Sequence, residues 1–569
     1  FQHYYLMRIY LSLLFLCIVA LSCKTKPEHK KTPKYGPIAE NAMVVSARAE
    51  ASKIGSEILE QGGNAFDAMF ATEMALAVTF PFAGNLGGGG FMVYRLENGE
   101  TGALDYREKA PLLSSKTMYQ DKNGNIIPNL STVGAKAVGV PGTIAGIFEA
   151  HRTFGSMPID SLLMPVIKLA EQGYVITKNQ KERLEYYAPV FDSVNGKTTL
   201  YSETLTDTVK NIALAKTLKR IATNGENEFY TGETGQKLVK FLSEKGGLIT
   251  LEDLKAYDAV WRDPITFTYD NLKIISMSPP SSGGICLAQI MGMIEPYDLQ
   301  QYKHNSAKYI QLITEAERRA YADRSHWLGD PDFTDIPLDS LISEAYLTQR
   351  MKSFSWDNAT KSSNVSHGNI IGYESDETTH YSIIDSYGNA ISVTTTLNGA
   401  YGSKLYVDEL GFFLNNEMDD FSSKPGVPNM FGLIGAEANS IAPEKRMLSS
   451  MTPTIVEKDG KLWMSVGTPG GSTIITSVLQ TILNVQEFNM TMQEAVDAPR
   501  FHHQWLPDVI RFEPDVFSTE ELITLKEKGY LINEEESPII GKVDGILIMP
   551  DGKLEGGADR RGDDTAIGF

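Results

Sequence analysis

The chain has 569 residues, of which 42% are hydrophobic and 22% charged. This composition excludes a disordered, collagen-like or rod-shaped protein. The formal net charge is −19, and a phosphate backbone needs a concentrated basic face, so we expect no nucleic-acid partner. The three cysteines, Cys17, Cys23 and Cys286, lack the paired spacing of a zinc site or a disulfide framework. We therefore expect no metal and no cofactor.

The amino-terminal segment is typical of an export signal. An apolar run follows Arg8 and ends at Leu21, which is short for a membrane span. It leads into Ala20-Leu21-Ser22-Cys23, which is similar to a bacterial lipoprotein cleavage site with Cys23 as the lipidated residue. We expect a leader over residues 1–23, a solvated tether over 24–36, and an exported periplasmic protein anchored to the membrane by lipid. Ordinary signal cleavage, which would release a soluble periplasmic protein, remains the alternative.

The globular part begins with helical patterns over residues 49–61 and 64–77. A glycine-rich turn over residues 84–90 follows and leads into a strand over 91–95. A phosphate-binding loop would need a Lys and a hydroxyl at the end of the turn and a helix after it. Because this turn ends in Phe91-Met92 and a strand, the phosphate-loop interpretation is disfavoured.

Further helices are predicted over residues 306–324 and 518–528, the second with a capping box formed by Ser518 and Glu521. Residues 377–471 are rich in strands. One hairpin joins 379–384 to 390–397, and a second joins 455–457 to 462–466. An amphipathic helix follows Gly470-Gly471. Strands packed on strands with helices outside indicate a layered α+β architecture.

The register of the first hairpin brings two hydroxyl groups together. If its turn is centred on Tyr387, Thr378 lies directly opposite Thr396, and period-two alternation places Asn398 on the same face. One hydroxyl could then tune the nucleophilicity of the other. From spacing alone, a purely structural pair of threonines is the favoured interpretation.

Seven short motifs, taken in order, resemble the gamma-glutamyltransferase family, also called glutathione hydrolases. The resemblance runs from about Met43 to the end of the chain. The motifs are Asp105 to Pro111, Pro279 to Gly284, Glu377 to Ser382, Asn415 to Phe421, Leu448 to Met451, Pro469 to Ser472 and Phe501 to Trp505.

The resemblance implies an N-terminal nucleophile hydrolase made as an inactive precursor. Its fold would be a four-layer αββα sandwich formed jointly by a large subunit, residues 37–377, and a small subunit, residues 378–569. The precursor would cut itself between Glu377 and Thr378 and leave a heterodimer. Cleavage would free the α-amine of Thr378, with an unperturbed pKa of roughly 7.7 to 8.0, beside the hydroxyl that it must deprotonate. His380 could then be merely a strand residue.

The implied activity is hydrolysis or transfer of gamma-glutamyl groups from glutathione and other gamma-glutamyl compounds. Thr378 would form a gamma-glutamyl acyl-enzyme, which water or an amino acid or peptide acceptor would resolve. A cephalosporin or glutaryl amide acylase of the same fold is the nearest alternative. Asp420 discriminates between them, because it would pair with an ammonium group that a glutaryl chain lacks. A lipoprotein that binds ligands without turnover is the alternative from another class.

The family's remaining site residues carry over position by position. Thr396 would hydrogen-bond the nucleophile, and the backbone amides of Gly470 and Gly471 would form the oxyanion hole. The last assignment has independent support, because two glycines before a helix present amides at the positive end of its dipole. The substrate α-carboxylate would be held by Arg107, Ser449 and Ser450, and the α-ammonium by Asn398, Glu417 and Asp420.

Each of these residues also has a structural interpretation, as a surface ion pair, a turn or a tight loop. His502-His503 could be metal ligands, but adjacent residues on an extended segment point in opposite directions, which favours packing. Residues 422–448 match the family's lid over the substrate, with Phe431 where a gating Tyr often stands. A mobile surface loop is the alternative for this segment.

Overall fold

The computed structural model describes residues 32–203, 207–366, 378–535 and 539–569. The chain divides into two units, Phe1–Lys34 and Tyr35–Phe569. The predicted leader, Cys23 and Glu377 lie outside the described residues. Within the described ranges, no helix combines the length and the hydropathy needed to cross a membrane.

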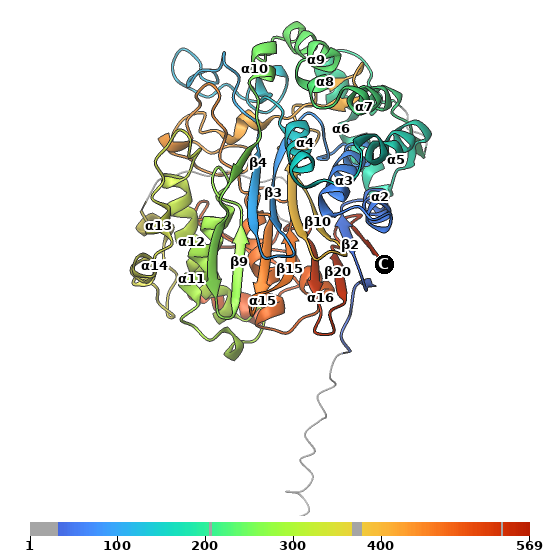
Figure 1. Cartoon of the computed structure of the whole chain (residues 1–569). Coiled ribbons are helices and arrows are strands. Elements are labelled where there is room, and N and C mark those ends of the chain that lie inside the picture. Colours follow the sequence, from blue (N-terminus) through green and yellow to red (C-terminus); the bar gives the residue numbers. More distant parts are fainter. Residues whose placement is uncertain (1–31, 204–206, 367–377, 536–538) are drawn as a thin grey trace, which may run out of the picture. The chain divides into compact units, whose positions relative to one another are not determined.

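Two antiparallel sheets of seven strands each form the centre of the Tyr35–Phe569 unit (Figure 1). The first sheet contains, in spatial order, β21 (Thr565–Gly568), β2 (Met43–Ser46), β10 (Thr378–Ile384), β11 (Ala390–Thr396), β3 (Gly89–Arg95), β4 (Thr101–Tyr106) and β7 (Val260–Arg262). The second contains β1 (Ile38–Ala39), β20 (Leu554–Ala558), β19 (Asp544–Ile548), β15 (Lys461–Gly467), β14 (Thr454–Lys458), β9 (Leu272–Ser276) and β8 (Ile265–Tyr269). The sheets pack face to face, with β10 and β11 of the first against β15 of the second.

Helices cover the outer face of each sheet (Figure 1). The first sheet is covered by α2 (Ala49–Glu60), α3 (Ala65–Thr79) and α4 (Thr143–Phe154), and α5 (Ile159–Gln172) packs on α3. The second is covered by α11 (Gly283–Ile294), α15 (Thr473–Gln486) and α16 (Met492–Asp497), and α12 (Ala307–Trp327) packs on α11. Separate hydrophobic clusters fill the two helix-to-sheet layers and the space between the sheets. The predicted αββα sandwich is therefore confirmed.

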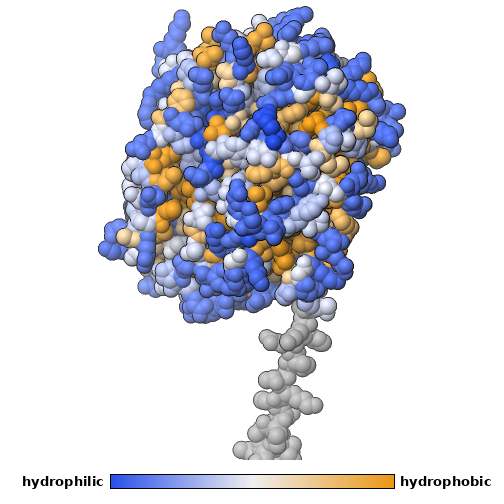
Figure 2. Space-filling view, in the orientation of Figure 1, coloured by the Kyte–Doolittle hydropathy of each residue, from blue (hydrophilic) through white to orange (hydrophobic). Residues whose placement is uncertain are grey.

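Further elements surround this sandwich. The helices are α6 (Lys178–Asn195), α7 (Ile212–Asn224), α8 (Asn227–Tyr230), α9 (Glu233–Glu244), α10 (Leu251–Lys255), α13 (Leu338–Leu341), α14 (Glu344–Met351) and α17 (Thr519–Glu527). The small sheets pair β5 (Tyr174–Val175) with β6 (Thr208–Val209), β12 (Tyr406–Val407) with β13 (Phe412–Phe413), and β16 (Phe501–His502) with β17 (Ile510–Phe512) and β18 (Ile532–Asn533). On the face shown in Figure 2, hydrophilic residues separate small hydrophobic areas, as is usual for a folded domain.

The hairpin formed by β10 and β11 has the predicted register, with Thr378 opposite Thr396. Its turn is held by the carboxylate of Asp385, which accepts hydrogen bonds from the backbone amides of Tyr387 (3.0 Å) and Asn389 (2.8 Å). The same carboxylate accepts from the amide of Ala65 (2.9 Å), the first residue of α3. One aspartate therefore fixes both the hairpin and the start of the helix that covers it.

The predicted capping box of α17 is wrong. Ser518 makes no side-chain capping hydrogen bond there. Glu521 instead accepts a hydrogen bond from the backbone amide of Ala307 (2.5 Å), the first residue of α12. The carboxylate thus caps a neighbouring helix that lies more than two hundred residues earlier in the chain, and local sequence does not encode that choice.

A seam of polar side chains runs between the two sheets. His380 lies there, within 2.9 Å of Thr394 Oγ1 through Nδ1 and 3.0 Å of Ser382 Oγ through Nε2. Ser465 of the second sheet donates to Ser382 Oγ at 3.0 Å. Burial lowers the pKa of His380 to about 3, so the ring is neutral. His380 is accordingly a strand residue, as expected, and the hydrogen bond between Ser382 and Ser465 joins the sheets beside it.

Candidate active site

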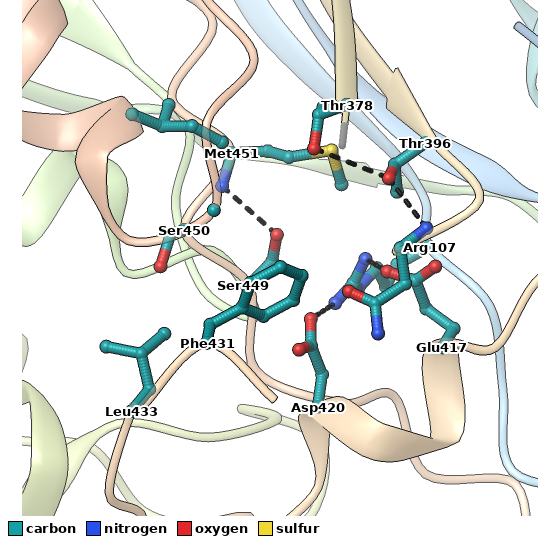
Figure 3. A pocket seen from close by; sticks show the side chains of 13 residues that line it. Arg107, Thr378, Thr396, Glu417, Asp420, Phe431, Leu433, Ser449, Ser450 and Met451 are labelled. Atoms are coloured by element: carbon teal, nitrogen blue, oxygen red, sulfur yellow. Dashed lines mark hydrogen bonds and ion pairs between the residues drawn. The ribbon is translucent and has the colours of Figure 1, made fainter. Parts of the chain in front are cut away.

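A cavity of about 280 Å³ opens beside the first residue of β10 (Figure 3). Every predicted catalytic or binding residue within the described chain lines it, except Gly470. Sequence analysis did not assign Leu433, Met451 or Ile474 to the site, although they also line the cavity. Residues from both halves of the chain thus converge on Thr378.

Thr378 begins β10, and only 6% of its surface is exposed. Its Oγ1 lies 3.4 Å from Oγ1 of Thr396 on the adjacent strand (Figure 3). The backbone amide of Asn398 donates to the Thr396 hydroxyl at 2.8 Å, where the chain turns with a positive φ of 71° at Asn398. The Asn398 amide therefore fixes the Thr396 hydroxyl, which faces the hydroxyl of the candidate nucleophile.

Gly470 and Gly471 adopt positive φ values of 137° and 52° just before α15. The Gly470 carbonyl accepts from Thr473 through both its backbone amide (2.9 Å) and its hydroxyl (2.7 Å), which pins the loop to the first turn of the helix. Within the described residues, neither glycine amide donates a hydrogen bond. Two amides at a helix N-terminus therefore remain available to a developing oxyanion.

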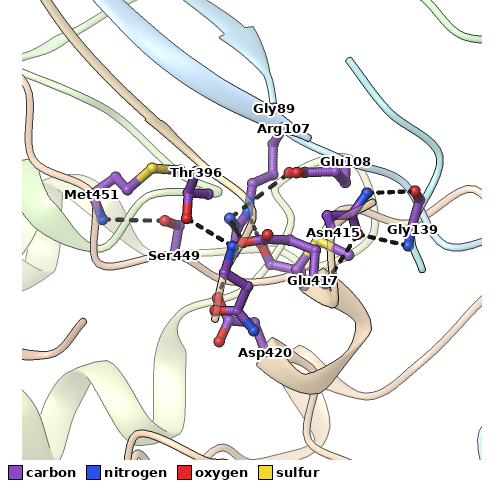
Figure 4. A network of polar contacts seen from close by, with 12 residues as sticks. Gly89, Arg107, Glu108, Gly139, Thr396, Asn415, Glu417, Asp420, Ser449 and Met451 are labelled. Atoms are coloured by element: carbon purple, nitrogen blue, oxygen red, sulfur yellow. Dashed lines mark hydrogen bonds and ion pairs between the residues drawn. The ribbon is translucent and has the colours of Figure 1, made fainter. Parts of the chain in front are cut away.

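Arg107 also lines the cavity and is almost fully buried (Figure 4). Its guanidinium donates to the carboxylate of Glu417 and, at 2.5 Å, to Asp420 Oδ2. It also donates to the carbonyl oxygens of Met447 and Leu448, at 3.3 Å each. Burial opposes its charge, but the surrounding carboxylates raise the pKa of Arg107, so it remains a cation.

Carboxyl groups outnumber the guanidinium in this network. Glu108 Oε2 lies 3.9 Å from Arg107 Nη1, and burial raises the pKa of Glu108 to about 8. Burial likewise raises the pKa values of Glu417 and Asp420. One cation and acceptor oxygens therefore share a small volume, an arrangement that fits the carboxylate and ammonium of an α-amino acid.

Ser449 and Ser450 border the same cavity from the segment before β14. Ser449 Oγ accepts from the backbone amide of Met451 at 3.1 Å (Figure 3). Ser450 Oγ accepts from Arg324 of α12 at 3.0 Å, and Arg324 also donates to Ser282 Oγ at 2.9 Å. Sequence analysis missed Arg324, because only the packing of α12 beneath residues 448–451 brings it to the site.

Phe431 and Leu433, which belong to the predicted lid over residues 422–448, line the cavity. Asn429 Nδ2 donates to Asp420 Oδ1 (3.0 Å), and the Met430 amide donates to Asp419 Oδ2 (2.8 Å). Phe431 lines the cavity and packs on Gly471, where an added Cβ would lie 2.8 Å from its ring. The lid is therefore tied to the same acidic segment that contacts Arg107.

His502 and His503 have separate partners. His502 lies 2.8 Å from Thr476 Oγ1 and 3.2 Å from Ser472 Oγ. His503 lies 3.3 Å from Asp508 Oδ1. Burial lowers the pKa of His503 to about 4. The two rings thus support the loop before α15 and the neighbouring segment, which agrees with the packing interpretation.

Comparison with known proteins gives one consistent family. A family model described as gamma-glutamyltranspeptidase matches residues 51–569. A glutathione hydrolase proenzyme from Escherichia coli (strain K12) is 44% identical over 538 residues, which are 93% of this chain and 92% of that protein. An acylase ACY 1 proenzyme from Pseudomonas sp. (strain V22) is 34% identical over 556 residues, 95% of each chain.

Solved structures agree with the fold. A gamma-glutamyltranspeptidase from Helicobacter pylori has a TM-score of 0.55 and 41% identity, and covers 60% of this chain and 97% of its own. A cephalosporin acylase from Bacillus halodurans has a TM-score of 0.81 over 96% of this chain and 99% of its own, at 23% identity, which shows the fold alone. With a family match over most of its length and a site built from that family's motifs, the chain belongs to the gamma-glutamyltranspeptidase family.

Proposed function

We propose that the chain is a precursor that cuts itself before Thr378 and then acts as a gamma-glutamyltransferase and glutathione hydrolase. The observation that carries this proposal is the position of Thr378. Its hydroxyl lies in one cavity with the Thr396 hydroxyl, the loop of Gly470 and Gly471, and the Arg107 network. An activated nucleophile, an oxyanion site and a binding site for an amino acid end are thereby combined.

Maturation would begin with attack of Thr378 Oγ1 on the carbonyl carbon of Glu377. The C–N bond of that peptide breaks, the acyl group moves to oxygen, and the proton passes to the new α-amine. Water then hydrolyses the ester and leaves a carboxylate on Glu377 and a free hydroxyl on Thr378. The released amine supplies the base that a neutral threonine needs.

Turnover would repeat this chemistry on the substrate. Thr378 Oγ1 attacks the gamma-carbonyl carbon, and its proton reaches the leaving amine through the α-amine. The amides of Gly470 and Gly471 stabilise the oxyanion, and an acyl-enzyme results. Water then gives glutamate, whereas an amino acid or peptide acceptor gives a new gamma-glutamyl amide.

The charges around Arg107 favour a gamma-glutamyl group over a glutaryl group. Both groups end in a carboxylate that Arg107, Ser449 and Ser450 could hold, but only the gamma-glutamyl group adds an ammonium. Asp420, with Asn398 and Glu417, supplies acceptors for that ammonium. A glutaryl group would leave Glu417 Oε2, which accepts no hydrogen bond within the described residues, without a partner, and this costs binding free energy.

The test compares the parent chain with Thr378→Ala and Thr378→Ser on a denaturing gel and with gamma-glutamyl-p-nitroanilide. We expect two bands and turnover in the parent, one uncut band without turnover in Thr378→Ala, and slower cleavage and turnover in Thr378→Ser. Sequencing of the smaller parent band should begin at Thr378. A single full-length parent band without turnover would favour the ligand-binding lipoprotein, and preferential cleavage of a glutaryl anilide would favour the acylase.

We propose in addition that residues 1–23 direct export and that Cys23 carries lipid at a membrane facing the periplasm. The apolar run and Ala20-Leu21-Ser22-Cys23 support this proposal. Intact-mass analysis of the mature large subunit tests it. A diacylglyceryl mass on an amino-terminal Cys23 is expected, and an unmodified amino terminus elsewhere would contradict it.

A further inference from the structure

Arg324, near the end of α12, is a buried cation to which the proposed function gives no role. Only 4% of its surface is exposed. Its Nη2 donates to Ser450 Oγ at 3.0 Å, and its Nε donates to Ser282 Oγ at 2.9 Å. Burying a charge costs free energy unless hydrogen bonds compensate it. The guanidinium is therefore committed to two serine hydroxyls, one of which belongs to the candidate substrate site.

The chemistry of the guanidinium fixes the direction of its hydrogen bond to Ser450. A guanidinium can only donate, so Ser450 Oγ accepts. A serine hydroxyl also carries one proton, and Ser450 Oγ donates it to no group within the described residues. Ser450 lines the first cavity, beside Thr378 (Figure 3). Its hydroxyl can therefore donate to an acceptor oxygen of a ligand in that cavity.

Ser449 is prepared in a similar way. Its Oγ accepts from the Met451 amide at 3.1 Å, so its proton too can be donated to a ligand. Ser282 Oγ, which accepts from Arg324, donates to the Ser449 carbonyl oxygen at 2.7 Å, and the Ser282 amide donates to the same oxygen at 2.8 Å. Arg324 therefore holds the Ser450 side chain directly and the Ser449 backbone through Ser282.

Arg324 also places positive charge close to the Arg107 network. It lines a second cavity, of about 270 Å³, which shares Asp420 and Leu433 with the first. Burial lowers the pKa of Arg324, the charge of Asp420 raises it, and the charge of Arg107 lowers it further. A guanidinium nevertheless stays charged in a protein. The region where a substrate carboxylate would bind is thus bordered by two cations.

A neighbouring cation offers a matched comparison. Arg350 of α14 forms an ion pair with Asp323, the residue before Arg324 on α12, at 3.0 Å. Its Nη2 also donates to the Arg319 carbonyl oxygen at 2.8 Å. Arg350 therefore stabilises the same part of α12 through contacts other than those to the serines.

We propose that Arg324 is a positioning residue that makes Ser449 and Ser450 hydrogen-bond donors to the α-carboxylate of the gamma-glutamyl group. The inference rests on the proposed function. Arg324 itself touches no substrate. Without it, the Ser450 hydroxyl would be free to turn, and substrate binding would have to order it. The loss therefore falls on binding and not on the chemical step at Thr378.

The experiment measures initial rates of gamma-glutamyl-p-nitroanilide hydrolysis by the cut enzyme. Arg324→Met should raise KM about tenfold and change kcat less than twofold, as loss of one hydrogen bond from a charged donor predicts. Arg324→Lys keeps the charge but lacks the fork that reaches both serines, so its KM should be intermediate. Arg350→Met is the matched control and should change neither constant more than twofold.

A double-mutant cycle tests whether Arg324 acts through Ser450. Arg324→Met added to Ser450→Ala should raise KM less than threefold beyond Ser450→Ala alone, because the hydroxyl that Arg324 positions is gone. A tenfold effect in both backgrounds would overturn the proposal. So would a parental KM in Arg324→Met, or equal effects of Arg324→Met and Arg350→Met.

Calorimetric titration with L-glutamate separates this inference from the proposed function. Arg324→Met should weaken L-glutamate binding about tenfold. Absence of turnover in the parent together with that weakening would contradict the proposed function alone. A parental affinity in the variant would overturn the inference, and a parent that does not bind L-glutamate would overturn both. If Arg324→Met does not fold, Arg324→Lys decides in the same cycle, since its effect should likewise shrink when Ser450 is replaced by Ala.

Discussion

Arg107 concentrates the binding chemistry of the site in one side chain. It contacts Glu417 and Asp420 at once, and these acceptors are also the predicted partners of the substrate ammonium. A bound amino acid end would therefore exchange ion pairs with the network, its carboxylate meeting Arg107 and its ammonium meeting the acids. The carboxylate and ammonium of the substrate would therefore pair with charged groups that already lie close together in the protein.

Replacing Arg107 by Ala should raise the KM for glutathione by about ten- to a hundredfold, because a charged hydrogen bond to the α-carboxylate is lost. The kcat should change much less, since Arg107 is proposed to hold the α-carboxylate and not the reacting carbonyl. Steady-state kinetics with glutathione measures both constants. A loss confined to kcat would contradict a binding role.

Arg107→Lys is the informative companion variant. Lysine keeps the positive charge but lacks the planar fork that reaches Glu417 and Asp420 together. Its KM should therefore lie between those of the parent and Arg107→Ala. A denaturing gel of each variant separates an effect on substrate binding from one on cleavage.

At the scale of single elements, α12 depends on a carboxylate from α17. Replacing Glu521 by Ala removes the acceptor for the Ala307 amide, at a cost of about 1 kcal/mol. Hydrogen exchange at the start of α12 should then become roughly fivefold faster. The matched control is Glu520→Ala, which removes an exposed carboxylate one residue earlier. Equal exchange in both variants would contradict the assigned cap.

The sequence predicted elements well where the determining contacts are local. The register of the β10 and β11 hairpin follows from a short turn centred on Tyr387, and the predicted pairing of Thr378 with Thr396 is confirmed. The apolar patterns of the sequence predicted the helices α2, α3, α12 and α15. The role of Glu521 and the position of Arg324 could not be predicted, because both depend on which distant helix packs beside them.

The site shows the same division. Family motifs predicted the residues that meet in the first cavity, although spacing alone favoured a structural role for most of them. The pairing of Arg107 with both acids required the fold, since those residues lie about three hundred positions apart.

At the scale of the whole molecule, the helix layer over the first sheet encloses a buried acid, Glu73 of α3. Its carboxyl group is fully buried beside the hydroxyl groups of Tyr381 and Thr395, and burial raises the pKa of Glu73 to about 7 although these hydroxyls lower it. Below pH 4.5 the group is protonated in both the folded and unfolded states. Stability is lost as the pH rises from about 4.5 to about 7, because in that range the unfolded chain ionises the group while the folded chain keeps it protonated.

Replacing Glu73 by Gln should therefore raise the free energy of unfolding at pH 8 by roughly 3 kcal/mol. Near pH 4.5 the same replacement should change the free energy of unfolding little. Denaturant unfolding of the uncut Thr378→Ala chain at the two pH values measures the difference. Glu60→Gln, an exposed change on α2, is the control and should show no such pH dependence. A constant difference between Glu73→Gln and its parent would contradict the assigned pKa.

Both sheets combine strands from before Thr378 with strands from the part of the chain that begins there. In the first sheet β2 lies between β21 and β10, and in the second β1 and β9 flank a block of strands from the C-terminal part. A backbone opened at Thr378 keeps every one of these strand pairings. After denaturation, however, recovery would require two separate molecules to meet, so refolding would become dependent on concentration. Maturation would thus replace a precursor that can refold as a single chain with an active heterodimer that refolds only when its two chains associate.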